Sequence, residues 1–194
     1  MPAKRSFAVL LGSIRRDRMG SRAATMVVRE LERRGHEVHL VDPLELQLPL
    51  LDRMYKEHAP GAAPELLERL AKLYRGVDGF LVVSAEYNHG IPPALKNLRD
   101  HFLEEYFWRP SGIVCYSAGG FGGVRAAMQL RMTLAELGMP SISSILPIPR
   151  IAEAISEDGF AQAPITEKSM SRFLDEFVWQ ADALAEARLA GTPY

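Results

Sequence analysis

The chain has 194 residues, with little cysteine and almost no net charge. Its single cysteine, Cys115, excludes a disulfide bond within the chain. The 23 Lys and Arg residues nearly balance the 24 Asp and Glu residues, so no overall charge attracts nucleic acid or an anionic membrane. The first apolar stretch ends before Gly12 and is too short for a signal peptide or a membrane span. We therefore expect a cytoplasmic protein that binds neither nucleic acid nor membranes.

Two common nucleotide-binding signatures are also missing. No lysine occurs between Lys4 and Lys56, which excludes a GxxxxGK[ST] loop for ATP after the first predicted strand. The same loop lacks G-x-G-x-x-G, which disfavours a dehydrogenase that binds a dinucleotide without flavin. Asp42 resembles the acidic residue that holds a ribose in such enzymes, but Asp42-Pro43 is more simply a turn at the end of a strand.

Hydrophobic residues make up 47% of the chain and charged residues 24%, which is typical of a soluble globular protein and excludes widespread disorder. The length favours one domain over residues 1–194. Short apolar runs alternate with longer amphipathic stretches, and this alternation predicts a parallel sheet covered by helices. The expected strands are 7–11, 38–41, 79–84, 112–117 and 141–148; the expected helices are 21–34, 64–75, 92–107, 123–137 and 166–189. Segments 43–64 and 151–163 are expected to be loops.

The first strand is followed by a loop suited to phosphate. It offers Gly12, Ser13, Arg15, Arg18 and Gly20, and Ser21 then begins a predicted helix. Helix N-termini present unpaired N–H groups to anions, and the arginine fork matches phosphate oxygens. The alternative is an ordinary turn with a helix cap and solvated arginines.

Two further loops follow the third and fourth strands. Glu86, Tyr87, Asn88, His89 and Gly90 lie where a buried strand ends, and they offer an aromatic face and amide groups to a planar heterocycle. Segment 117–125 contains four glycines in five positions, which permits close approach of a ligand to the backbone. A structural turn and a flexible hinge are the respective alternatives.

In a flavodoxin-like sheet of order 2-1-3-4-5, these three loops meet at one crevice. The chain resembles the NAD(P)H-dependent FMN reductases, a flavodoxin-like family that includes chromate, quinone and azo-dye reductases. The resemblance covers about residues 6 to 150. Its motifs are Gly12-Ser13-Ile14-Arg15, the segment from Ala85 to Asn97, and Ser117 to Ala126 followed by Gln129-Leu130-Arg131. Ala85 and Pro93 depart from the family pattern, which usually has proline and glycine there.

The resemblance implies a three-layer, doubly wound α/β fold with five parallel strands, and FMN as the bound cofactor. NADPH or NADH would supply hydride in a ping-pong reaction, and the acceptor would be free flavin, a quinone, an azo compound or a metal oxyanion. The alternative is an FMN-binding redox sensor with incidental turnover. Either a homodimer or a homotetramer is expected.

The resemblance also implies which residues would contact FMN. No catalytic acid or base and no metal are expected, because the cofactor carries the chemistry. The residues expected to contact FMN are Gly12, Ser13, Arg15, Arg18, Gly20 and Ser21 at the phosphate, Glu86, Tyr87, Asn88, His89 and Gly90 at one ring edge, and Ser117, Ala118, Gly119 and Gly120 at the other.

Overall fold

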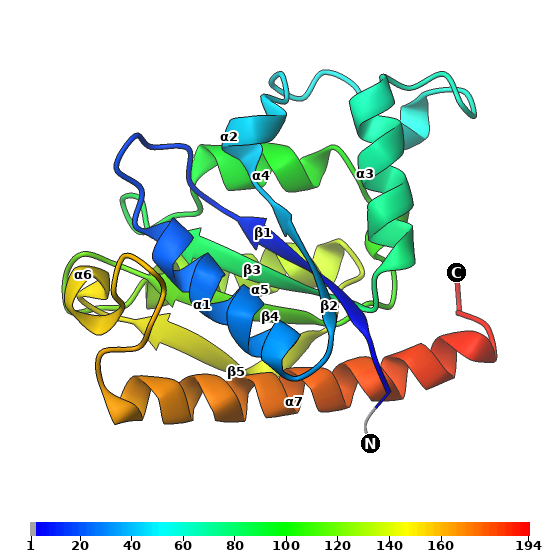
Figure 1. Cartoon of the computed structure of the whole chain (residues 1–194). Helices are drawn as coiled ribbons and strands as arrows, with labels where there is room; N and C mark the ends of the chain where they lie inside the picture. Colours follow the sequence, from blue (N-terminus) through cyan, green and yellow to red (C-terminus); the bar gives the residue numbers. More distant parts are fainter. Residues whose placement is uncertain (1–2) are drawn as a thin grey trace.

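A computed structural model describes residues 3–194 and contains one five-stranded sheet (Figure 1). The strands are β1 (Ser6–Leu11), β2 (Glu37–Val41), β3 (Gly79–Ala85), β4 (Ser111–Tyr116) and β5 (Ser141–Ile148). They are all parallel, in the order β2-β1-β3-β4-β5. The predicted flavodoxin-like order is thereby confirmed.

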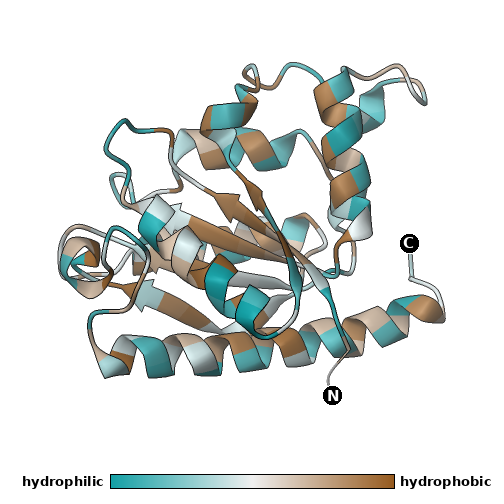
Figure 2. Ribbon diagram, in the orientation of Figure 1, coloured by the Kyte–Doolittle hydropathy of each residue, from teal (hydrophilic) through white to brown (hydrophobic). Residues whose placement is uncertain are grey.

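Helices cover both faces of the sheet, as the apolar strands require. The helices are α1 (Gly20–Arg33), α2 (Pro43–Leu46), α3 (Glu65–Gly76), α4 (Pro93–Asp100), α5 (Val124–Glu136), α6 (Ile151–Ala154) and α7 (Pro164–Leu189), with short 3₁₀ turns at Tyr55–Glu57 and Glu104–Tyr106. Phe7, Val9 and Leu11 pack with residues of α1 and α7, whereas Ala8 and Leu10 pack with residues of α3, α4 and α5. Figure 2 shows this layering: the strands are mostly brown, the colour of hydrophobic residues, and the helices on either side carry both hydrophobic and hydrophilic residues. Successive strand residues therefore enter opposite cores.

The predicted helix over 92–107 is too long, because α4 ends at Asp100. The chain then turns so that Phe102 and Tyr106 enter the core beside Tyr74. The ring centroid of Tyr74 lies 5.0 Å from that of Phe102 and 5.3 Å from that of Tyr106. Leu103, which lies between the two aromatic residues, has φ −147° and ψ −69°, outside the helical region, so the chain leaves α4 here and buries both rings against α3.

Two predicted loops contain helical turns. Segment 43–64 contains α2 and the turn Tyr55–Glu57, and the Asp42 carboxylate caps α2 by accepting the Leu44 N–H at 2.9 Å. Segment 151–163 begins with α6, which buries Ile151, and Ile155 after it is buried as well. The expectation of a surface loop there is wrong, because this segment covers one end of the core.

Among residues 3–194, no helix has both the length and the apolar character that crossing a membrane requires.

Arg34, the C-cap of α1, joins this helix to α7, and Glu30 holds Arg34 in place. The Glu30 carboxylate accepts hydrogen bonds from Arg33 at 2.7 Å and from Arg34 at 2.9 Å, and Arg34 also pairs with Asp175 of α7 at 2.7 Å. The hydrogen bond from Arg33 and that from Arg34 lower the pKa of Glu30 from 4.5 to about 2. The ionised carboxylate therefore favours the folded state.

Replacement of Glu30 should remove a pH-dependent part of the stability. We expect Glu30→Gln to lower the free energy of unfolding by roughly 1–2 kcal/mol at pH 7. Because the folded-state pKa is depressed, the difference from the wild type should shrink as the pH falls from 4.5 toward 2. Urea unfolding at pH 7 and pH 3 measures both values. The exposed Glu32 on the same helix provides the control Glu32→Gln, and an equal loss in both variants would contradict the assignment.

Candidate functional site

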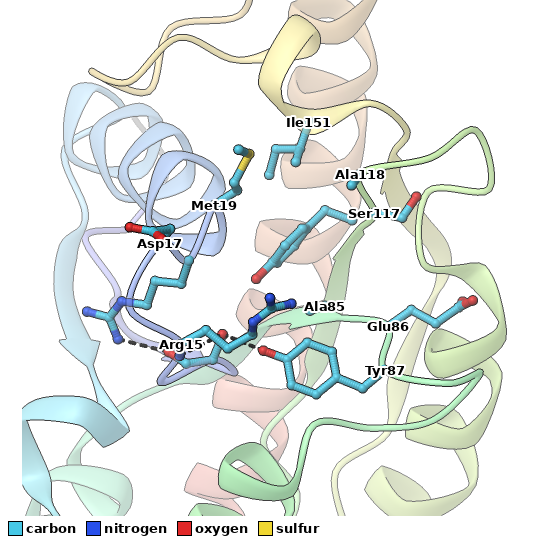
Figure 3. Close-up of a pocket in the computed structure, with 12 residues that line it drawn as sticks. Arg15, Asp17, Met19, Ala85, Glu86, Tyr87, Ser117, Ala118 and Ile151 are labelled. Carbon is cyan, nitrogen blue, oxygen red and sulfur yellow. Dashed lines mark hydrogen bonds between the residues drawn. The ribbon is translucent and has the colours of Figure 1, made fainter.

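A cavity of about 300 Å³ lies beyond the carboxyl ends of β1, β3 and β4 (Figure 3). Parallel α/β sheets bind ligands at this edge, where the strand order reverses direction along the chain. The three loops singled out in the sequence all reach the cavity. It is lined by Ser13, Arg15, Asp17, Arg18, Met19, Ala85, Glu86, Tyr87, Tyr116, Ser117, Ala118 and Ile151.

Ser13 joins the first loop to the second. Its side chain is almost fully buried, and its hydroxyl lies 2.7 Å from the Tyr87 hydroxyl, an interaction drawn in Figure 3. The same Ser13 oxygen accepts the Arg15 N–H at 3.3 Å. These bonds hold the loops after β1 and β3 at a fixed spacing across the cavity floor.

The arginines of the first loop differ in their partners. Arg18 pairs with Asp42 through both terminal nitrogens, and it also donates to the Ser13 carbonyl oxygen at 2.9 Å. Asp42 thus neutralises Arg18, and their pair shapes the loop. The exposed Arg15 guanidinium has no hydrogen bond or ion pair with any of residues 3–194, and it lies 5.9 Å from the centroid of the Tyr87 ring. Arg15 is therefore the cation that an anionic ligand would meet.

Tyr116, the last residue of β4, forms an inner wall of the cavity. Burial raises the pKa of Tyr116 to about 12, so its phenol is neutral at physiological pH and can donate a hydrogen bond. The first turn of α1 comes close to this ring because it begins with Gly20. A Cβ atom on Gly20 would stand 2.4 Å from the Tyr116 hydroxyl oxygen, so a larger residue would displace the helix or the tyrosine.

Glu86 lines the cavity, but its carboxylate points away toward α5, as Figure 3 shows. One carboxylate oxygen accepts the N–H groups of Arg125 at 3.0 Å and Ala126 at 3.4 Å, and the other lies 2.7 Å from the Arg125 guanidinium. The carboxylate thus caps the N-terminal turn of α5. This carboxylate therefore holds the second loop against α5.

The second loop closes in a two-residue turn. Tyr87 and Gly90 exchange backbone hydrogen bonds of 3.0 and 2.9 Å, and Asn88 and His89 both have positive φ, at 50° and 66°. This is the pattern of a type I′ turn. Arg125 donates to His89 Nε2 at 2.8 Å, which holds the turn against α5. The neighbouring hollow is lined by Arg15, Glu86, Tyr87 and Asn88.

The structure brings some of the predicted residues to the cavity and leaves others outside its lining. Ser13, Arg15, Arg18, Glu86, Tyr87, Ser117 and Ala118 line it; Gly12, Gly20, Ser21, Asn88, His89, Gly90, Gly119 and Gly120 do not. Five further lining residues were not predicted: Asp17, Met19, Ala85, Tyr116 and Ile151. Ala85 and Tyr116 end β3 and β4, so the rule that ligands bind at strand ends offered a signal for both. Ile151 offered none, because it reaches the cavity from a distant segment.

Comparisons with known proteins agree with this geometry. The sequence model of the family described as "NADPH-dependent FMN reductase" matches residues 6–153. An NAD(P)H-dependent FMN reductase of Schizosaccharomyces pombe is 32% identical over 162 residues, 76% of each chain. A quinone reductase of Pseudomonas putida is 29% identical over 89% of this chain and 92% of the relative.

Solved structures have the same fold. FerB, a flavoenzyme NAD(P)H:(acceptor) oxidoreductase of Paracoccus denitrificans, superposes with a TM-score of 0.78 at 24% sequence identity, over 92% of this chain and 98% of that one. A flavodoxin of Pseudomonas aeruginosa superposes with a TM-score of 0.56 at 19% identity, over 91% of this chain and 98% of that one. With its matched sequence model, its relatives and its loop motifs, the chain belongs to the NADPH-dependent FMN reductase family, whose enzymes use FMN and a reduced nicotinamide.

Proposed function

We propose that this protein binds FMN in the cavity and uses NAD(P)H to reduce a small-molecule acceptor by a ping-pong reaction. Free flavins, quinones, azo compounds and metal oxyanions remain candidate acceptors, and quinones are favoured because relatives named quinone reductases align with most of the chain. The observation that carries the proposal is that Arg15, which has no partner among residues 3–194, lines a cavity that also presents Tyr87, Tyr116, Met19, Ala118 and Ile151.

The residues present fit FMN. A phosphate needs cationic and N–H donors. Arg15 and the Ser13 hydroxyl line the cavity, and the first-turn N–H groups of α1, at Gly20 and Ser21, directly follow Met19, which also lines it. A flavin ring needs apolar contact, and Tyr87, Tyr116, Met19, Ala118 and Ile151 supply it around the rest of the cavity. Arg18 retains Asp42 as its partner, so we assign the direct phosphate contact to Arg15.

The chain's residues would act by binding, orienting and excluding water. FMN, when bound, supplies both the acceptance and the donation of hydride, so no protein acid or base is required. The hydrogen bond between Ser13 and Tyr87 and the Glu86 cap on α5 fix the loops that would contact the ring. Met19 and Ile151 form an apolar wall that would limit water on one side. Because bound FMN would carry the hydride between the two half-reactions, donor and acceptor can use the same site in turn, which is the ping-pong order.

Absorption spectroscopy tests the proposal directly. Purified protein mixed with FMN and freed of excess should keep flavin absorption bands, which should bleach with NADPH under nitrogen and return with a quinone. Parallel initial-rate lines over varied NADPH and quinone would support the ping-pong order. Protein that retains no FMN, or FMN that NADPH does not bleach, would contradict the proposed function.

Arg15 should bind the phosphate and contribute little to flavin-ring binding. We expect Arg15→Met to weaken FMN binding about 10- to 100-fold, because a charge-assisted contact is lost, with little change in riboflavin binding. Quenching of flavin fluorescence on titration with apoprotein measures both constants. Arg16→Met is the matched control, since Arg16 is an exposed neighbour outside the cavity lining. An equal loss of FMN and riboflavin affinity would contradict the phosphate assignment, because Arg15 would then contribute to binding of the flavin ring or to folding.

We also propose that the protein self-associates as a homodimer or homotetramer. The supporting observation is that Met128 and Met132, one turn apart on α5, are 48% and 68% exposed and form an apolar strip. Light scattering coupled to size-exclusion chromatography should give a mass of at least twice 21.6 kDa. A monomer mass at micromolar concentration would refute this proposal.

A further inference from the structure

The glycine segment after β4 extends beyond the cavity. Ser117 and Ala118 line the cavity, but Gly119 and Gly120 do not, although both were expected to contact the flavin. Both glycines are exposed, and no atom lies within 4 Å of a Cβ built on Gly119. Within residues 3–194, the N–H groups of Gly119, Gly120 and Phe121 donate no hydrogen bond to the protein. The backbone here is open to a ligand that acts as a hydrogen-bond acceptor.

An aromatic ring and an exposed arginine flank this open backbone. Phe121 is 68% exposed, and the Arg125 guanidinium lies 4.4 Å from its ring centroid. Arg125 is held in place by Glu86 at 2.7 Å and His89 at 2.8 Å. On the other side, Nη2 of Arg150 lies 3.8 Å from the position of a Cβ on Gly120. The exposed Arg150 guanidinium has no hydrogen bond or ion pair with any of residues 3–194.

Phe121 follows Ala118 by three residues and Arg150 directly precedes Ile151, and both Ala118 and Ile151 line the cavity. A fully extended chain covers about 3.3–3.6 Å per residue, so Phe121 is within the reach of a dinucleotide whose other end is at the flavin. Aromatic rings stack on nucleobases, and arginine forks bind phosphate. We propose that Phe121 and Arg150 hold the adenosine 2′-phosphate part of NADPH.

This inference rests on the proposed function and makes it more specific, because it selects NADPH over NADH. Arg150 pairs with the 2′-phosphate, which only NADPH carries. Phe121 stacks on the adenine that both nucleotides share. The open N–H groups of Gly119 and Gly120 face the phosphate oxygens that connect the two halves of the dinucleotide. The Arg125 guanidinium braces the ring of Phe121 and remains paired with Glu86.

Calorimetric titration of the FMN-loaded protein with adenosine 2′,5′-bisphosphate and with 5′-AMP tests these assignments. The wild type should bind the bisphosphate about tenfold more tightly than 5′-AMP. Arg150→Met should remove that difference, because it should weaken only the binding of the bisphosphate. Phe121→Ala should weaken both probes about tenfold. The matched control is Arg69→Met on α3, which removes an exposed arginine remote from the cavity lining and should change neither affinity.

A second readout is the ratio of kcat/KM for NADPH to kcat/KM for NADH, which Arg150→Met should lower about tenfold. Unchanged probe affinities and an unchanged ratio in Arg150→Met would overturn the inference. It would also be overturned if Phe121→Ala altered the association state without altering probe binding, since Phe121 would then be a subunit contact. Wild-type protein that retained no FMN would instead refute the proposed function, so the two failures are distinguishable.

Discussion

The arrangement of the site depends on one carboxylate, that of Glu86. It leaves the end of β3 and caps the first turn of α5 with hydrogen bonds to two backbone N–H groups, while its other oxygen pairs with Arg125. This places the loop after β3 and the loop after β4 in one rigid unit. Since Tyr87 follows directly and bonds to Ser13, the same carboxylate also positions the loop after β1. All three loops around the cavity are thus linked through a short series of polar contacts.

Charge is distributed unevenly within this site. Arg18 and Arg125 are both paired with carboxylates, from Asp42 and Glu86, so they shape loops at little net charge. Arg15 and Arg150 are exposed and have no such partners among residues 3–194. An unpaired guanidinium beside a concave surface attracts phosphate, whereas a paired one would first have to give up its carboxylate. This contrast separates the arginines that build the site from those assigned to ligands.

Sequence patterns predicted the regular elements well where hydrophobic burial acts on both faces. Continuous apolar runs such as Phe7–Leu11 are typical of strands covered by helices on both sides, and the structure confirms all five strands. The pattern failed where packing between distant residues decided the result. The helix predicted to reach residue 107 ends at Asp100, and Phe102 and Tyr106 then pack on Tyr74 of α3, a contact that no local pattern contains.

The sequence by itself determined the layered α/β architecture, the strand order through its family resemblance, and the three loops that hold the chemistry. These features follow from local residue types, because apolar runs, glycines and polar loop residues decide the secondary structure of the segment in which they lie. Only the tertiary structure decided which side chains face the cavity. The partner of Arg18, the direction of Glu86 and the arrival of Ile151 depend on contacts between residues far apart in the chain. Such contacts form only when the whole sheet has assembled, and they separate the ligand-facing groups from the structural ones.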